Sequence, residues 1–176
     1  MAKQEFTSAS TSINTVNKVY TKCEFKRGSK VLDWGGGEYD TNKQYMAKKG
    51  VDVGVYDPFN RSNEHNMKIL ERYMLPNYIV CSNVLNVIKE ESIVIDVLKK
   101  LRLYSRPGTT IYISIYEGDR SGVGRQSKKD SWQRNETAGA YKGIIETVFG
   151  VSEGNAIVSK KENIFTIKIL KFTALN

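Results

Sequence analysis

Apolar positions along the chain alternate between a spacing typical of strands and a spacing typical of helices. Short apolar runs predict strands at residues 30–34, 51–56, 78–81 and 109–116. Apolar residues at helical spacing predict helices at residues 13–23, 39–49, 61–74, 90–104 and 135–149. Two further β-branched runs, 155–159 and 164–170, are joined by a short polar turn and predict an antiparallel hairpin.

This order of elements predicts an α/β fold. Strands that alternate with helices pair in parallel, and right-handed crossovers place helices on both faces of the sheet. We therefore expect a Rossmann-like, doubly wound and mostly parallel sheet with a C-terminal antiparallel hairpin. Residues 1–176 are expected to form a single domain, with the Ser- and Thr-rich residues 1–12 loosely held.

Three consecutive glycines, Gly35, Gly36 and Gly37, separate the first predicted strand from the helix that follows it. Glycine lets the backbone turn sharply and approach a ligand closely. Asp57 follows the second predicted strand, where a carboxylate can hold ribose hydroxyls. A dinucleotide fingerprint needs another glycine at position 40, which is Asp40, and this acid would repel a pyrophosphate. The pattern therefore predicts a nucleoside ligand that places no phosphate at this loop.

The segment Asp33-Trp34-Gly35-Gly36-Gly37 resembles the first motif of class I S-adenosylmethionine-dependent methyltransferases, an acid followed by x-G-x-G-x-G. Tyr39 stands at the position of the third glycine. The resemblance covers residues 28–116, and it implies that Asp57 binds the cofactor ribose. The run Val84-Leu85-Asn86-Val87-Ile88 is also similar to one in small phage-encoded and DNA-phosphorothioation-associated methyltransferases.

This resemblance implies S-adenosylmethionine (SAM) as the cofactor, S-adenosylhomocysteine (SAH) as its product, and no metal. The expected cofactor-binding residues are Asp33, Gly35, Gly36, Gly37, Tyr39, Asp57, Pro58, Asn66, Ser82 and Asn83. Asn66 is included because the family places an acid or amide against adenine. Asn83 and Asn86 follow a predicted strand whose carboxyl end faces the ligand crevice, although either could instead cap a helix.

The reaction itself is constrained by motifs that the chain lacks. It has neither N-P-P-Y, the hallmark of methylation on exocyclic amines, nor the Pro-Cys of covalent cytosine methylation. Cys81 lies inside an apolar run and is expected in the core. Direct in-line transfer remains, which needs positioning and desolvation more than a base. The candidate catalytic residues are Asn86, Glu117 and Asp119, with His65 as a further candidate base.

The formal net charge of +8 is concentrated in two segments. Residues 1–30 hold six basic and two acidic side chains, and residues 118–134 hold five and two. This concentration favours an anionic partner over a general role in solubility. We expect the loop 117–134 to overhang the crevice and to bind a phosphate backbone and stacked bases. The expected substrate-binding residues are Arg120, Arg125, Lys128, Lys129, Trp132, Gln133 and Arg134.

These observations predict SAM-dependent methyl transfer to an anionic substrate, a nucleic acid or a nucleotide. A solvated loop with Trp132 packed on the next helix is the alternative for 117–134. A small-molecule or protein methyltransferase and a catalytically idle, regulatory SAM-binding domain also stay open. Two cysteines and one histidine argue against a disulfide framework or a zinc site and favour a cytoplasmic location. No apolar run approaches the ~20 residues that span a membrane, so no membrane partner is expected.

Overall fold

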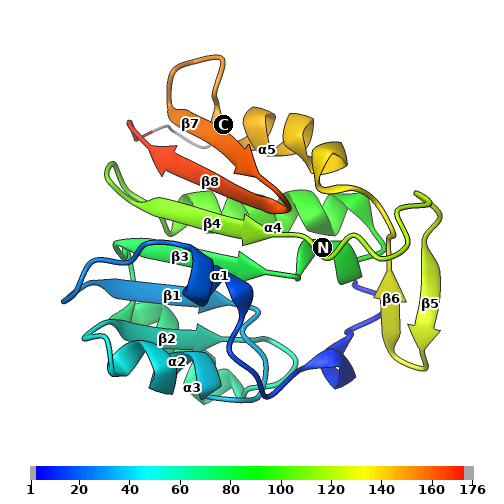
Figure 1. The fold of residues 1–176 in the computed structure, drawn as a ribbon, viewed down its shortest axis with the longest axis horizontal. Helices are drawn as coiled ribbons and strands as arrows, with labels where there is room; N and C mark the ends of the chain where they lie inside the picture. The colour runs from blue at the N-terminus through cyan, green and yellow to red at the C-terminus, as the bar shows by residue number, and fades with distance from the viewer. Residues whose placement is uncertain (1–2, 173–176) are drawn as a thin grey trace.

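The computed structural model describes residues 3–172 and places a central sheet between two layers of helices (Figure 1). The strand order is β2-β1-β3-β4-β8-β7. The first four of these strands pair in parallel, whereas β8 and β7 are antiparallel. Their bounds are β1 (Lys30–Trp34), β2 (Asp52–Tyr56), β3 (Tyr78–Ser82), β4 (Thr110–Ser114), β7 (Ala156–Lys161) and β8 (Ile164–Ile169). The predicted Rossmann-like sheet with its C-terminal hairpin is confirmed.

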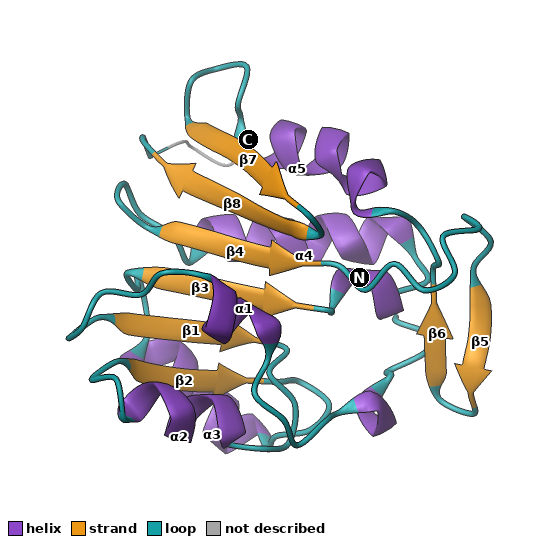
Figure 2. Ribbon diagram, in the orientation of Figure 1, coloured by secondary structure: helices purple, strands orange, loops and turns teal. Residues whose placement is uncertain are grey.

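Helices cover both faces of the sheet, as Figure 2 shows. Alternate residues of β1 point to opposite faces: Val31 packs with α1 and α2, whereas Leu32 packs with α3, α4 and α5. The helices are α1 (Lys18–Lys22), α2 (Thr41–Ala47), α3 (Asn63–Arg72), α4 (Glu91–Leu103) and α5 (Lys142–Phe149), with 3₁₀ turns η1 (Ala9–Thr11), η2 (Leu85–Val87) and η3 (Ala138–Tyr141). None of the helices in residues 3–172 has the length and apolar character to span a membrane.

All the predicted helices are shorter than their apolar patterns suggested, α1 and α5 most of all. α1 begins at Lys18 rather than at residue 13, because the Asn17 side chain accepts a hydrogen bond from the N–H of Val19 and caps the helix there. α3 packs through Ile69 and Leu70 and leaves Met67 exposed. Met67 lies inside α3 but on its exposed side, and Met74 lies beyond the helix end and is also exposed, so these two residues do not share a buried face with Leu70.

Residues 117–134, expected to be a loop, contain a second, two-stranded sheet. β5 (Arg125–Lys128) pairs antiparallel with β6 (Ser131–Gln133) at the carboxyl end of the main sheet (Figure 1). All four residues of β5 are exposed, so the strand has no buried face and no alternating apolar pattern. This absence of an apolar face is why the sequence pattern did not predict a hairpin.

The N-terminal strap, residues 4–17, runs from this hairpin to α1. The Ser8 N–H donates to the Asp130 carbonyl at 2.8 Å, and the Ser10 hydroxyl donates to the Asp130 carboxylate at 2.5 Å. The Phe6 ring stacks on Trp132 with centroids 5.5 Å apart. Residues 3–12 are therefore tied to the hairpin by tertiary contacts, in contrast to the loose segment expected from their composition.

Candidate cofactor and substrate site

A cavity of about 810 Å³ opens at the carboxyl ends of β1, β3 and β4. Its walls are the glycine loop 35–37, residues 57–60 after β2, residues 82–88 after β3, the N-terminal strap and the β5–β6 hairpin. Ligands of open parallel sheets bind at this edge, because the strands end there side by side. Ligand pockets span roughly 300–1,000 Å³, so this cavity has room for a cofactor and a small second molecule.

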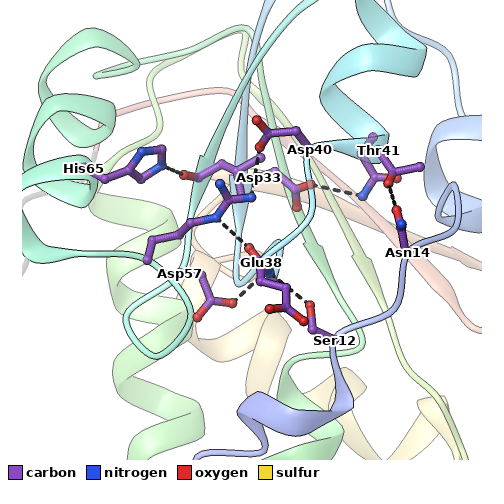
Figure 3. A network of polar contacts seen from close by, with 12 residues as sticks. Ser12, Asn14, Asp33, Glu38, Asp40, Thr41, Asp57 and His65 are labelled. Carbon is purple, nitrogen blue, oxygen red and sulfur yellow. Dashed lines mark hydrogen bonds and ion pairs between the residues drawn. The ribbon is translucent and has the colours of Figure 1, made fainter.

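The glycine loop is held from two sides. The N–H of Gly37 donates to the Asp57 carboxylate at 2.9 Å, and Arg61 Nε donates to the Gly37 carbonyl at 2.9 Å (Figure 3). A Cβ on Gly36 would lie 2.8 Å from both the Asp33 and Val55 side chains. Gly35 has φ +75°, and a Cβ there would meet Val84 at 2.5 Å. The loop therefore requires glycine for close packing as well as for its backbone conformation.

Asp57 is buried, and its carboxylate accepts three backbone hydrogen bonds. They come from the N–H groups of Gly37, Phe59 and Asn60, each at 2.9 Å. An ionised carboxylate offers about four acceptor positions, so one remains for a ligand hydroxyl. Asn66 holds the Asp57 backbone through its own amide, at 3.0 and 2.8 Å, and does not line the cavity. Its position behind Asp57 gives no support to the expected adenine contact.

Asp33 lines the cavity at the end of β1 and is also buried. Burial raises the pKa of Asp33 to about 6, against the lowering effect of the neighbouring Tyr20 hydroxyl and Asn42 amide. The buried Tyr20 hydroxyl lies beside Asp33. A desolvated carboxylate of this kind favours a cation as its neighbour. No three His, Cys, Asp or Glu side chains within residues 3–172 gather as a metal site.

A chain of small polar side chains crosses the ends of β3 and β4. Asn17 Nδ2 donates to the Ser82 hydroxyl at 2.6 Å, and Ser82 is hydrogen-bonded to Ser114. Asn83 accepts from the Ser114 hydroxyl at 3.3 Å and has a left-handed backbone, φ 56°. Such backbone conformations in residues other than glycine concentrate at functional sites. Ser82 and Asn83 both line the cavity, where the sequence placed them.

Asn86 is part of a clamp on the backbone of Tyr116. It accepts from the Tyr116 N–H at 3.3 Å and donates to the Gln133 side chain at 3.1 Å, while Gln133 donates to the Tyr116 carbonyl at 3.0 Å. The Tyr116 ring is 60% exposed and lines the cavity. Sequence reasoning missed Tyr116, although its place directly after the β-branched run at the crevice could have indicated it.

The acidic candidates for catalysis are both engaged in ionic contacts. Glu117 does not line the cavity; it accepts from the Ala138 N–H at 2.7 Å and pairs with Arg120 at 2.7 Å, and these contacts lower its pKa. Asp119 lines the cavity, but hydrogen bonds from Ser121 and the charge of Arg125 lower its pKa. Neither acid has the raised pKa that favours a general base.

His65, the further candidate base, also has a structural contact. Its Nε2 lies 2.8 Å from the Val55 carbonyl, on the strand at the edge of the sheet. Figure 3 shows the imidazole directed at that backbone rather than toward Asp57. The ring therefore satisfies a carbonyl of the edge strand and does not line the cavity.

The basic candidates for substrate binding divide into two groups. Arg125, Trp132 and Gln133 line the cavity, whereas Arg120, Lys128, Lys129 and Arg134 do not. Arg120, Arg125 and Arg134 pair with Glu117, Asp119 and Glu136 at 2.7–2.9 Å. The positive charge of the hairpin that no acid pairs with therefore belongs to Lys128 and Lys129, both exposed.

Trp132 is covered by the N-terminal strap. Phe6 stacks on the indole, and Lys89 Nζ lies 5.1 Å from its centroid. The backbone of Gly124 is packed so closely that a Cβ there would meet the indole at 2.5 Å. The contact with Phe6 differs from both expected arrangements, an open stacking face for a base and packing against the following helix.

Sequence and structure comparisons place this fold among known enzymes. No curated protein is significantly similar to the chain in sequence. The structure resembles Burkholderia thailandensis 1,6-didemethyltoxoflavin-N1-methyltransferase with bound 1,6-didemethyltoxoflavin and SAH (TM-score 0.58, 15% identity, 82% of this chain and 72% of that one). It also resembles one chain of the complex between the Haloferax volcanii Trm112 methyltransferase activator and the putative methyltransferase (TM-score 0.57, 10% identity, 98% of this chain and 100% of that one).

A third similar structure is a SAM-dependent methyltransferase from Methanosarcina mazei (TM-score 0.54, 10% identity, 84% of this chain and 95% of that one). At these identities the likeness concerns the fold. The family model of the methyltransferase domain matches residues 6–146, which is most of the chain and includes the glycine loop, Asp57 and the β5–β6 hairpin. The expected enzyme class is thereby confirmed, and the chain belongs to the methyltransferase domain family.

Proposed function

We propose that the protein transfers a methyl group from SAM to a small acceptor held inside the cavity. The observation that carries this proposal is the charge of the lining. Its acidic and basic side chains are Asp33, Asp57, Asp119 and Arg125, and Arg125 pairs with Asp119 at 2.9 Å. A cavity with this excess of carboxylates attracts a cation such as the sulfonium and ammonium groups of SAM.

The residues of the site fit the parts of SAM. The remaining acceptor position of Asp57 suits a ribose hydroxyl, and the glycine loop allows the amino-acid chain to approach the backbone. Asp33 supplies a carboxylate for the cationic end. Of the expected cofactor-binding residues, Tyr39 and Asn66 do not line the cavity, so this assignment rests on the others.

SAM supplies an electrophilic methyl carbon when it is bound. The pKa values of Glu117 and Asp119 are lowered, so neither acid is suited to act as a general base. The contribution left to the chain's own residues is to exclude water and to align the acceptor. The strap and the hairpin enclose the space in front of residues 82–88. The Asn86–Gln133 clamp fixes the Tyr116 backbone at the same place, so the ring is available to contact the acceptor.

This enclosure supports a small, uncharged acceptor. No cation that lines the cavity is left without an acidic partner among residues 3–172, so a phosphate inside it would have no strong counter-charge. Trp132 lines the cavity, but one face of its indole is stacked on Phe6, which leaves less of the ring for a base. The similar toxoflavin enzyme holds 1,6-didemethyltoxoflavin beside SAH, which is a precedent for a small acceptor in this fold.

A nucleic acid or nucleotide is the second candidate substrate, and one observation favours it. Lys128 and Lys129 lie exposed at the tip of the hairpin that borders the cavity, and neither forms an ion pair in the described structure. A phosphate backbone lying across this tip would contact both side chains. Replacing both with alanine would then reduce the salt dependence of binding by ~0.7–0.9 in log–log slope for each phosphate that a lysine no longer neutralises.

Labelled SAM separates these possibilities. The purified protein is incubated with methyl-labelled SAM and, in parallel, with a small-molecule filtrate of cell extract, DNA, RNA and total protein. We expect label in the small-molecule fraction and calorimetric binding of both SAM and SAH. Label in nucleic acid would favour the second candidate. Binding of SAM without transfer to any fraction would indicate the regulatory alternative, and no SAM binding would refute the proposal.

A further inference from the structure

We propose that the N-terminal strap belongs to the cofactor site and that its Ser12 and Thr15 hydroxyls bind the carboxylate of the methionine part of SAM. This inference rests on the proposed function, since it concerns the same cavity. The strap forms a continuous part of the cavity wall. Its lining residues are Gln4, Thr7, Ser8, Thr11, Ser12, Ile13, Thr15 and Asn17.

The carboxylate of the ligand needs hydrogen-bond donors. SAM and SAH both carry a carboxylate, and a buried carboxylate is costly unless hydrogen-bond donors surround it. Arg125 is the basic side chain of the lining, and its guanidinium pairs with Asp119 at 2.9 Å. The other charged groups of the lining, Asp33, Asp57 and Asp119, are themselves carboxylates. Neutral hydroxyl and amide donors therefore have to serve the ligand's carboxylate.

The strap offers two hydroxyl donors, Ser12 and Thr15. The Ser12 hydroxyl accepts a hydrogen bond from the Glu38 N–H at 2.9 Å, so its own proton can still be donated. Figure 3 shows Ser12 reaching from the strap to the loop beside Glu38 and Asp57. Thr15 lines the cavity three residues later at its exposed rim, and its hydroxyl has no hydrogen-bond partner among the described residues. Both donors come from the strap.

Asp57 and Asp33 define the direction in which SAM would lie across the cavity. Asp57 marks the ribose end, and Asp33 marks the cationic end at the tip of β1. The strap passes between these points: Ser12 lies against the glycine loop, and Asn17 donates to Ser82 at the end of β3. A methionine chain that runs from Asp57 toward β3 therefore passes beneath residues 12–17.

The strap combines firmly held residues with an exposed segment. Phe6 stacks on Trp132, and the buried Ser8 contacts both Asp130 and the Val87 carbonyl. None of the η1 residues is buried, and Ile13 is 64% exposed. Segments with few buried apolar contacts have low free energies of local opening, so we expect residues 9–13 to open more readily than the part held by Phe6 and Ser8.

A truncated ligand tests the assignment. 5′-Deoxy-5′-methylthioadenosine keeps the adenosine and sulfur of SAH but lacks the amino-acid part. In calorimetry, the double substitution Ser12→Ala and Thr15→Val should weaken SAH binding about tenfold or more, and binding of the truncated ligand less than about twofold. Ser10→Ala is the matched control, because it lies on the same strap, contacts Asp130 and does not line the cavity. This control should weaken the binding of both ligands equally, or of neither.

Equal losses for both ligands in the double variant would overturn the carboxylate assignment, and so would unchanged SAH binding. A second measurement uses the unaltered chain: backbone hydrogen exchange in residues 4–17 should slow more with SAH than with the truncated ligand. Identical protection by the two ligands would also overturn the inference. Failure of the wild-type protein to bind either ligand would refute the proposed function itself, an outcome distinct from these.

Discussion

The carboxylate of Asp57 accepts a 2.9 Å hydrogen bond from the N–H of Gly37, which joins the turn after β2 to the turn after β1. The two strands are parallel neighbours, so their carboxyl ends lie side by side. Arg61 reinforces the junction by donating to the Gly37 carbonyl and pairing with Asp40 at 2.9 Å. These contacts therefore join the two parts of the proposed cofactor site directly to each other.

Removing this junction should affect both folding and binding. Asp57→Ala leaves the N–H groups of Gly37, Phe59 and Asn60 without their acceptor. An unsatisfied buried donor costs about 1–3 kcal/mol, so we expect the free energy of unfolding to fall and SAM affinity to drop about tenfold or more. Asp57→Asn keeps one acceptor oxygen, so its stability and SAM affinity should lie between those of the wild type and Asp57→Ala. Denaturant titration and calorimetry measure the two effects, and an unchanged SAM affinity in folded Asp57→Ala would contradict the assignment.

The titration of Asp33 should make SAM binding depend on pH. Burial raises the pKa of Asp33 to about 6, so at lower pH the group is mostly neutral. A cationic ligand favours the ionised form, and protons then compete with SAM. We expect the dissociation constant of SAM to rise as the pH falls from about 7 to about 5, and Asp33→Asn to remove most of that dependence. A variant with the wild-type pH profile would exclude Asp33 as the titrating group.

Ionisation of Asp33 should lower the free energy of unfolding at neutral pH. Its pKa is about 6 in the folded state against an ordinary value of 3.8, so between these values the folded chain holds a proton that the unfolded chain has released. The stability contributed by Asp33 therefore falls as the pH rises through this window and does not return above it. Asp33→Asn should raise the free energy of unfolding at pH 7 by about 1–3 kcal/mol and do so less at pH 4. Thermal unfolding at both pH values is the measurement.

Alanine substitutions at Gly36 and Gly143 distinguish a glycine that close packing requires from one that only adds backbone flexibility. Gly36→Ala would force a Cβ to within 2.8 Å of the Asp33 and Val55 side chains, and such overpacking costs about 1–3 kcal/mol. We expect lower stability and weaker SAM binding. Gly143→Ala is the control: it lies in α5 with nothing within 4 Å, and it should stabilise the protein by about 0.5–1 kcal/mol. Equal effects of the two substitutions on SAM binding would argue against a ligand at the loop.

Cys81 should prove to be a packing residue. It is fully buried in β3, and burial strongly raises the pKa of its thiol. Cys81→Ala should lower the free energy of unfolding by about 1–2 kcal/mol while methyl transfer is retained. In the native protein a thiol reagent should label the half-buried Cys23 and spare Cys81. Loss of transfer with SAM binding preserved would instead point to a covalent role.

The main sheet, the glycine loop 35–37 and the enzyme class were all predictable from local features of the sequence. β1 has the predicted bounds, because Lys30–Trp34 is a compact apolar run between a glycine turn and a glycine loop. The position of Asp57 one strand later follows from the same pattern. These features depend on residues close together in the chain, so local periodicity and turn chemistry are enough to predict them.

The walls of the cavity, in contrast, depend on contacts between distant parts of the chain. The strap and the β5–β6 hairpin are polar segments without an apolar period, and contacts between residues 120 or more positions apart, such as Ser10 with Asp130, hold them together. The same long-range contacts pair the hairpin arginines with acids and cover Trp132 with Phe6. A charge count along the chain therefore indicated a basic binding loop, whereas in the fold most of that charge is neutralised and the cavity walls are acidic, because an ion pair depends on distance in space and not in sequence.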